Sequence, residues 1–332
     1  MTYADQCYLF TAQKILASPY SDKNLEVRPK WLDGTPAHTR KIFYDAHVYD
    51  LRKEFPMMTL RRTYWKSALQ EILWIYQKKS NVIAELGSHI WDEWDVGDGT
   101  IGKGYGYQIG LKAKHHKVGT VPSMIELAHT IQENGGAWRV VNGKPVIEYP
   151  SWEIRNVDGE DWVYLDQMDA VLYDLKHNFT SRSIMTTTYN PQDLADMGLR
   201  PCAFGMYYNV TVDENTGKKY LNAVLQQRSQ DMLTASNWNT VQYAFLLMLV
   251  ARECNLTPGV LVHCRFDTHV YDRHEPIVRD MIEKAETEPN DYEAPLVYIP
   301  PDAPSFYEFT PNDMVVENYK YDEFNEKIEV AV

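Results

Sequence analysis

The sequence predicts an α+β fold, in which helices pack against a mostly antiparallel or mixed sheet. Helical and strand patterns occupy separate stretches of the chain instead of alternating, which disfavours a doubly wound architecture. Residues 241–255 are apolar on nearly every side, and this predicts a buried central helix. Hydrophobic residues make up 44% of the 332-residue chain, which is enough for an extensive core and argues against disorder.

The first part of the chain predicts a helix, a strand and a second helix. Apolar residues recur at helical spacing over residues 3–17, whereas residues 42–51 have the pattern of a strand. Residues 64–80 form the clearest helical pattern, and Glu71 lies inside it. Residues 91–113 combine glycines with interleaved aromatic side chains, which predicts an ordered loop.

A compact insertion is predicted at about 114–164. Residues 124–136 have the pattern of a helix that ends at two glycines. The Asn-Gly pair at 142–143 is a strong hairpin signal, and the Asp-Gly pair at 158–159 marks a second hairpin. We therefore expect a single domain over residues 1–332 that carries a helix-plus-hairpin subdomain. A surface embellishment is the commoner interpretation of such a segment, and a partner or regulatory surface is the alternative.

The second half predicts further helices and a run of strands. In chain order, the patterns are a helix running into a polar turn at 167–183, a strand at 183–190, a long hairpin at 202–232, a strand at 261–271 and a helix at 274–287.

Charge and composition limit the partners. The chain carries 33 Lys and Arg against 46 Asp and Glu, a formal net charge of −13, and such an anionic excess repels a phosphate backbone. No stretch approaches the ~18 consecutive apolar residues of a membrane helix, and the first residues do not resemble a signal peptide. We therefore expect a cytoplasmic protein with no nucleic-acid substrate and no membrane partner.

The cysteines and motifs exclude several chemistries. Cys7, Cys202, Cys254 and Cys264 share no CxxC spacing, so neither a disulfide framework nor a zinc site is predicted. No HExxH, phosphate-loop or dinucleotide-binding pattern occurs, and we expect no metal. A buried, reduced thiol is the ordinary interpretation of each cysteine. Cys202 could instead be a nucleophile, provided that nearby cations lower its thiol pKa.

Several polar residues are candidates for binding an anion. Arg228 and Ser229 lie together at the end of a strand pattern, although a solvated turn is the ordinary interpretation. Arg28 and Arg182 also lie in turns. If these four side chains converged, they would form a phosphate site, but the sequence alone does not show convergence.

Three further residues can present hydrogen-bonding groups. Asn239 precedes the apolar helix, where it would be a helix cap or a two-sided hydrogen-bond reader. His269 and Tyr271 share one face of a strand, because strand side chains alternate.

Seven segments, read in this order, carry a family resemblance: VRPKWLDGTPAHT, FPMMTLRRTYWKSALQEILWIY, IWDEWDVGDGTIGKGYGYQ, TSRS with YNPQDLADMGLRPC, QRSQD followed by WN, DTHVY, and EVAV. Together they resemble the thymidylate synthase family over nearly the whole chain except about 114–164. The resemblance implies a single α+β domain of that type. It also implies a homodimer that converts dUMP to dTMP, with 5,10-methylenetetrahydrofolate as the one-carbon and hydride donor and without a metal.

The resemblance also implies catalytic roles. Cys202 would attack C6 of the uracil, and Arg228 would lower the thiol pKa and bind the phosphate. Asn239 would hydrogen-bond the uracil O4 and N3–H together, which favours dUMP over dCMP. Glu71 and Tyr105 would organise waters and proton transfers.

Binding roles follow in the same way. The phosphate would be held by Arg28, Arg228, Ser229 and an Arg182 donated across the dimer interface, and the sugar 3′-hydroxyl by His269 and Tyr271. Gln227 and Asp231 would complete the nucleotide site, with Asp231 also facing the pterin. The remaining folate contacts would be Tyr64, Trp91, Trp94, Leu199, Ala331 and Val332, the last two forming a lid that excludes water.

The chain departs from the family pattern in places. Ser183 stands where the second of two consecutive arginines is usual, so one phosphate ligand is missing or replaced. Other departures are Arg200 where proline is common, Ala203 where histidine is usual, Ala235 at a usual glycine, and Arg61 at a common lysine.

Two other functions compete with the leading one. The first is a dUMP hydroxymethylase on the same fold, in which water instead of hydride quenches the intermediate. Trp91 argues for the synthase, because a bulky aromatic residue there shields the intermediate from water. The second is a non-catalytic nucleotide-binding protein with RNA-binding activity.

Overall fold

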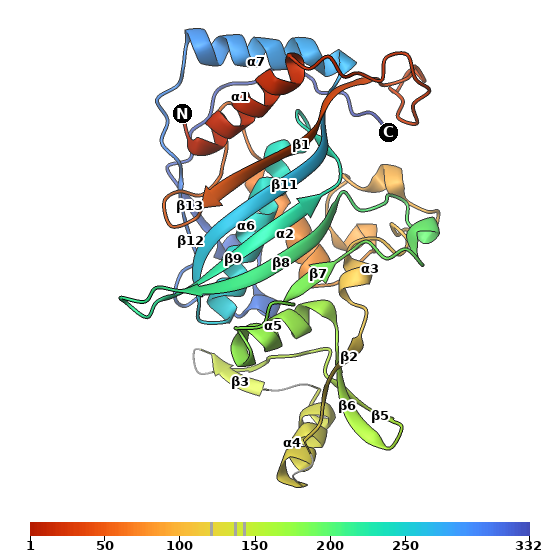
Figure 1. The fold of residues 1–332 in the computed structure, drawn as a ribbon, viewed down its shortest axis with the longest axis vertical. Helices are drawn as coiled ribbons and strands as arrows, with labels where there is room; N and C mark the ends of the chain where they lie inside the picture. The colour runs from red at the N-terminus through yellow and green to blue at the C-terminus, as the bar shows by residue number, and fades with distance from the viewer. Residues whose placement is uncertain (120–121, 136–137, 142–143) are drawn as a thin grey trace.

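The computed structural model describes residues 1–119, 122–135, 138–141 and 144–332. Its largest sheet has the strand order β1-β11-β9-β8-β7, and the short β10 pairs with β11 (Figure 1). These strands are β1 (Thr39–Asp50), β7 (Met185–Thr187), β8 (Ala203–Val212), β9 (Lys219–Gln227), β10 (Gln230–Asp231) and β11 (Thr257–Tyr271). β11 is parallel to β9 and β10, and the other pairs are antiparallel. The predicted mixed sheet is confirmed.

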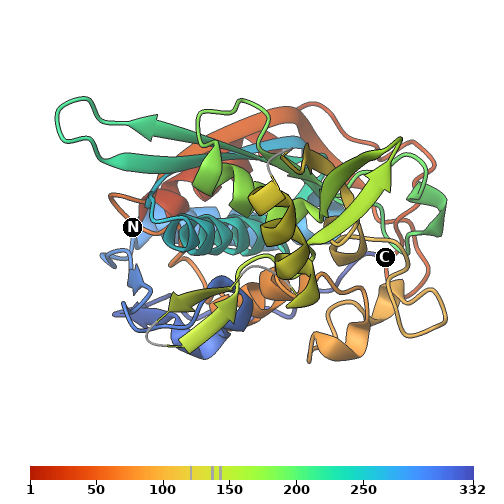
Figure 2. The same ribbon diagram turned by 90° about the horizontal axis from the view of Figure 1, so that it is seen from below.

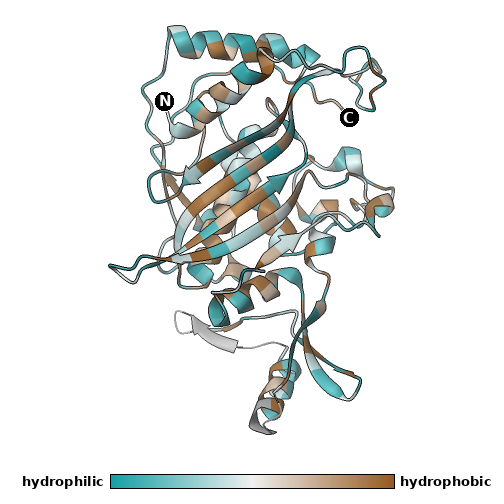
Figure 3. Ribbon diagram, viewed as in Figure 1, coloured by the Kyte–Doolittle hydropathy of each residue, from teal (hydrophilic) through white to brown (hydrophobic). Residues whose placement is uncertain are grey.

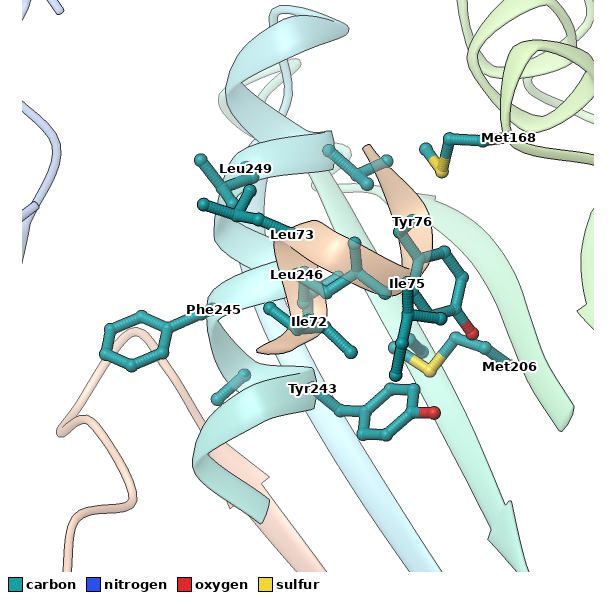
Figure 4. Close-up of a cluster of buried hydrophobic side chains, with 14 of the residues drawn as sticks. Ile72, Leu73, Ile75, Tyr76, Met168, Met206, Tyr243, Phe245, Leu246 and Leu249 are labelled. Carbon is teal, nitrogen blue, oxygen red and sulfur yellow. The ribbon is translucent and has the colours of Figure 1, made fainter. Parts of the chain in front are cut away.

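Two helices cover one face of this sheet. They are α2 (Trp65–Tyr76) and α6 (Ser236–Glu253), and Figure 2 shows them in a layer on one side of the strands. Figure 4 shows Ile72, Leu73 and Tyr76 of α2 packed beside Tyr243 and Leu246 of α6. All five side chains are at most 3% exposed, and each such residue contributes about 1.5–3 kcal/mol through burial. The predicted buried central helix is confirmed.

A second apolar cluster lies beyond β1. α1 (Tyr3–Leu16) packs there against α7 (Glu275–Thr287), with Tyr8, Ile15 and Val278 among its buried members. The N-terminus of α1 is closed by a capping box, because Thr2 and Asp5 exchange hydrogen bonds. Both helices match the predicted segments.

The segment around 114–164 forms a three-stranded sheet and a separate two-stranded sheet, which lie away from the large sheet, beneath α5 (Gln167–His177) (Figure 1). Its elements are β2 (Ala113–Lys117), α4 (Pro122–Glu133), β3 (Trp138–Val141), β4 (Lys144–Ile147), β5 (Glu153–Val157) and β6 (Glu160–Leu165). β5 and β6 meet at Asp158 and Gly159, both with positive φ, as the hairpin prediction required. β3 pairs with β4 as predicted, although residues 142–143 of that turn lie outside the described residues, as does residue 136.

The remaining elements are short and lie in the connections. They are η1 (Ile83–Glu85), η2 (Asp92–Trp94), α3 (Gly106–Ile109), η3 (Leu194–Asp196), η4 (Asp272–His274), β12 (Leu296–Tyr298), η5 (Phe306–Glu308), η6 (Pro311–Asp313) and β13 (Val315–Glu317). η2 and α3 fall within the loop predicted at 91–113.

Apolar side chains also occur on the face of the large sheet that α2 and α6 do not cover. On β1, Tyr44 and Val48 are 51% and 52% exposed, and on β11 Phe266 stacks on Tyr44. Figure 3 shows hydrophobic residues along the strands of the large sheet. Among the described residues, no helix has the length and apolar character that crossing a membrane requires.

Candidate active site

A cavity of about 700 Å³ lies where the ends of β9 and β11 meet the first turn of α6. Every residue predicted for the site lines it except Arg182 and Tyr64. The predicted residues that it brings together are Arg28, Glu71, Trp91, Trp94, Tyr105, Leu199, Cys202, Gln227, Arg228, Ser229, Asp231, Asn239, His269, Tyr271, Ala331 and Val332.

Cys202 lies immediately before β8 and beside a guanidinium. Its Sγ is 3.8 Å from Nη2 of Arg228, and its backbone N–H donates to the hydroxyl of Tyr105 at 2.9 Å. Burial raises the pKa of the Cys202 thiol, and this outweighs the opposite effects of Arg228 and Arg28. The expected net lowering of the thiol pKa is therefore not found in the single chain.

Arg228 is anchored to the backbone that precedes the cysteine. Its Nε donates to the carbonyl of Pro201 at 3.0 Å, and its Nη2 donates to the carbonyl of Arg200 at 2.7 Å. Arg200 stands where proline is common in the family, but its contact with Arg228 uses only the backbone carbonyl oxygen. Either residue would therefore accept this hydrogen bond. The guanidinium is thus held in place beside Cys202.

Glu71 projects from α2 into the cavity wall and accepts three hydrogen bonds. The donors are Trp91 Nε1 at 2.7 Å, Trp238 Nε1 at 2.6 Å and Gln242 Nε2 at 2.7 Å. Burial raises the pKa of the Glu71 carboxyl, and the three hydrogen bonds act against that shift. Trp238 and Gln242 were not predicted as site residues, although their i, i+4 spacing places them on one face of the helix.

Asn239 lies inside the first turn of α6, because the helix begins at Ser236. Neither its expected position before the helix nor its role as a cap is found. Its Oδ1 accepts from Gln227 Nε2 at 3.1 Å, and its Nδ2 donates to Gln242 Oε1 at 3.1 Å. An amide has four hydrogen-bonding positions, so one acceptor and one donor remain to face the cavity.

The carboxylate of Asp231 accepts hydrogen bonds from the turn that leads into α6. It accepts from the backbone N–H groups of Leu233 and Thr234 at 2.8 and 3.1 Å, and from the Thr234 hydroxyl at 2.6 Å. The carboxylate lines the cavity in a fixed orientation.

His269 and Tyr271 project from β11 into the same cavity, with ring centroids 5.1 Å apart. Burial alone lowers the pKa of His269, but the nearby Asp267 and Asp231 carboxylates reverse the shift and raise it overall. Lys41 of β1 lies directly opposite His269 in the strand register and also lines the cavity. Lys41 and Asp267 were missed by the sequence interpretation.

An apolar wall occupies the other side of the cavity. The Trp91 ring contacts Trp94 and Tyr105 edge-on, at centroid distances of 5.3 and 5.1 Å. Leu199 lines the same side. Gly198 permits this packing, because a Cβ there would lie 2.1 Å from the carbonyl oxygen of Trp94. Such a wall fits a flat aromatic ring system.

The last residues of the chain lie across the cavity. The backbones of Val332 and Lys30 exchange two hydrogen bonds, at 2.8 and 3.0 Å. The side chain of Glu329 accepts from the backbone N–H of Leu32 at 3.1 Å. Ala331 lies between these anchors and lines the cavity.

Two predicted residues lie outside the cavity. Arg182 is exposed in the turn between α5 and β7. Tyr64 is 57% exposed and stacks against Arg62 instead of facing the cavity. For the part of the chain that the structure describes, no group of three or more His, Cys, Asp or Glu residues could hold a metal ion.

These features define a cavity that can present a thiol, positive charge and a paired hydrogen-bond donor and acceptor to a ligand. Cys202 can supply the nucleophile, Arg28 and Arg228 the positive charge, and Asn239 the paired donor and acceptor.

Comparison with known proteins identifies the family. The family model described as thymidylate synthase matches residues 6–332. The thymidylate synthase of Bacillus licheniformis is 34% identical over 97% of this chain and 96% of its own length, and that of Bacillus phage phi3T is 33% identical with the same coverage. Thermostable thymidylate synthase A of Bacillus subtilis has a solved structure that covers 99% of both chains, with a TM-score of 0.76 and 32% identity. The chain belongs to the thymidylate synthase family and is a methyltransferase, and the hydroxymethylase alternative is not favoured.

Proposed function

We propose that this protein carries out the reductive methylation of dUMP to dTMP with Cys202 as the nucleophile. The observation that carries this proposal is the position of the Cys202 sulfur, 3.8 Å from the anchored Arg228 guanidinium and inside the cavity. The co-substrate 5,10-methylenetetrahydrofolate supplies the one-carbon unit and the hydride. The apolar wall of the cavity fits its ring system.

Attack by the Cys202 thiolate on C6 of the uracil forms an S–C bond. The electrons of the C5–C6 double bond move toward C4, so that negative charge develops on O4 and C5 becomes nucleophilic. The free N–H of the Asn239 amide supports charge on O4, and its free acceptor position suits N3–H of the same ring. Because burial raises the pKa of the Cys202 thiol, Arg228 is the group that stabilises the thiolate during attack.

The nucleotide phosphate is bound by Arg28, Arg228 and Ser229, which all line the cavity. His269 and Tyr271 bind the sugar, and Gln227 orients Asn239. A second copy of the chain contributes its Arg182, which is exposed in the turn before β7.

Water must be excluded for hydride, instead of hydroxide, to complete the reaction. Trp91 is fixed by its hydrogen bond to Glu71 and forms a bulky wall against water. Trp94 and Leu199 extend that wall, and Ala331 and Val332 cover the opening. This arrangement supports methylation over hydroxymethylation. Glu71 and Tyr105 organise the proton transfers at O4 and C5.

We also propose a homodimer that forms through the open face of the large sheet. Tyr44, Val48 and Phe266 form an apolar stripe there, and an apolar face of this kind favours association. The whole chain then acts as one catalytic domain, with the segment at about 114–164 as a peripheral subdomain. Cys7, Cys202 and Cys264 are free thiols, which fits a reducing compartment such as the cytoplasm.

The test is product analysis by mass spectrometry after incubation with dUMP and methylenetetrahydrofolate. We expect dTMP and dihydrofolate; hydroxymethyl-dUMP and tetrahydrofolate would contradict the proposal. We also expect 5-fluoro-dUMP plus the co-substrate to give a covalent adduct that Cys202→Ser abolishes. Full turnover by the Cys202→Ser variant would exclude nucleophilic catalysis by this residue.

A further inference from the structure

Lys41 and His269 are joined by a chain of polar contacts along one wall of the cavity. The two residues are direct partners in the β1–β11 register, so their side chains share one face of the sheet. Lys41 Nζ donates to Oδ2 of Asp267 at 3.0 Å. The other carboxylate oxygen, Oδ1, lies 3.2 Å from Nδ1 of His269. Asp267 therefore connects the cation on β1 to the imidazole on β11.

The contacts of His269 fix the position of its ring hydrogen. Nδ1 lies 2.9 Å from the backbone carbonyl oxygen of Asp267, in addition to the carboxylate oxygen. Both neighbours accept hydrogen bonds, so Nδ1 must carry a hydrogen. In the neutral ring Nε2 is then an acceptor, and the residue lines the cavity. His269 is thus arranged to accept a hydrogen bond from a hydroxyl group.

Asp267 is held in an unusual backbone conformation. Its φ is +40°, in the left-handed region that residues with a side chain rarely adopt. Such a conformation persists only where surrounding contacts enforce it, and it is concentrated at functional sites. Lys41 supplies one of those contacts. Its Nζ also lies 3.6 Å from Asp22 Oδ2, and that carboxylate accepts two hydrogen bonds from Thr39, each at 2.6 Å.

The positive charge of Lys41 also offsets negative charge on the same wall of the cavity. Asp22, Asp231 and Asp267 all line the cavity that a nucleotide phosphate has to enter. Lys41 pairs with both Asp22 and Asp267, so its loss would leave more negative charge on the cavity wall. The lysine therefore both orients Asp267 and reduces the repulsion of an anionic substrate.

We propose that Lys41 is a positioning residue for the nucleotide sugar. It holds Asp267 so that His269 presents Nε2 to the 3′-hydroxyl of the substrate, and the site thereby selects nucleotides that carry this hydroxyl. The inference rests on the proposed function, which assigns this end of the cavity to the sugar of dUMP.

The test compares dUMP with its 2′,3′-dideoxy analogue, which lacks the 3′-hydroxyl. In the wild-type protein the analogue should bind about tenfold more weakly by calorimetry, as expected for the loss of one hydrogen bond. In Lys41→Met, dUMP binding should weaken by about tenfold, and the two ligands should bind within about twofold of each other. His269→Ala should show the same loss of discrimination. In turnover assays, the effect should fall mainly on KM instead of kcat.

Two further variants separate positioning from a general structural defect. Lys41→Arg keeps the positive charge and should restore most of the discrimination. Lys112→Met is the matched control, because Lys112 also makes a 3.0 Å ion pair, with Glu153, and is similarly exposed at 35% compared with 31% for Lys41. This control should bind both ligands as the wild type does. Asp267→Asn provides a second route if Lys41→Met does not fold, since asparagine tolerates positive φ but carries no charge to pair with the lysine.

The binding and turnover results distinguish a failure of this inference from a failure of the proposed function. Undiminished discrimination in a folded Lys41→Met variant would overturn the inference, as would loss of discrimination in Lys112→Met. A wild-type protein that binds both ligands but forms no dTMP would instead contradict the proposed function. Because binding is measured without turnover, the two failures are distinguishable.

Discussion

Burial is the main cause of the raised pKa values of Cys202 and Glu71 at this site. Cys7 and Cys254 are buried, whereas Cys202 is partly buried, lines the cavity and lies 3.8 Å from the Arg228 guanidinium. Glu71 is likewise an acidic residue inside an otherwise apolar helix face, where three hydrogen-bond donors surround it. The sequence identifies both residues as candidates but does not reveal the direction of their pKa shifts. That direction depends on the balance between desolvation and neighbouring charges, which only the packed structure determines.

The raised pKa of Glu71 predicts a pH-dependent term in the stability. The unfolded carboxyl titrates near 4.5, and the folded one at higher pH. Between these two values the folded state holds more protons, so the free energy of unfolding should decrease as pH rises through this interval. Above the folded pKa the contribution should be constant. Glu71→Gln removes this titration, so its stability should decrease less over the same interval.

Urea denaturation midpoints of both proteins between pH 4 and 8 would test this. The control is Glu214→Gln, in an exposed turn, which should follow the wild-type curve. Parallel curves for Glu71→Gln and wild type would show that the folded carboxyl does not titrate at raised pH.

At the level of elements, sequence patterns located the helices and strands but not the sides that they present to the site. The apolar run at 241–255 predicted the buried part of α6 correctly. It missed the first turn, from Ser236, because Ser236, Asn237 and Asn239 do not continue the apolar pattern. That turn carries the polar groups that face the cavity. A helix that is buried all round has no amphipathic signal from which its functional face could be predicted.

The first turn of α6 also positions Glu71, and this can be tested at Trp238. Trp238→Phe preserves an aromatic ring but removes the Nε1–H that donates to Glu71 Oε2 at 2.6 Å. We expect kcat for dTMP formation to fall about tenfold, since a hydrogen bond to a charged group is lost, with KM for dUMP changed less than about twofold. Trp162→Phe, in the peripheral subdomain, should leave both constants unchanged. An unchanged kcat in Trp238→Phe would show that this donor does not orient Glu71 for catalysis.

For the whole molecule, collinear motifs predicted the fold and 16 of the 28 residues that line the cavity. Seven local segments carried that information, because each retains a backbone turn or side chain that the site requires. The sequence missed Lys41 and Asp267, whose partnership depends on the β1–β11 register. Lys41 and Asp267 are separated by 226 residues along the chain, so no local sequence pattern could indicate their contact. The proposed contribution of Arg182 requires a second chain, so it cannot be read from the contacts within one chain.

Arg182 provides the decisive prediction for the assembly. It is exposed and lies outside the cavity, yet the proposed site needs its charge from a second copy. Arg182→Gln and Cys202→Ser homodimers should therefore both have little activity, the first lacking a phosphate ligand and the second the nucleophile. When the two variants are mixed, unfolded and refolded together, random association makes about half of the dimers mixed. In each mixed dimer one site combines two mutated chains and the other combines intact Cys202 with intact Arg182. The mixture should thus recover about a quarter of the wild-type turnover. A refolded mixture with no more activity than the separate variants would mean that each site is built from one chain alone.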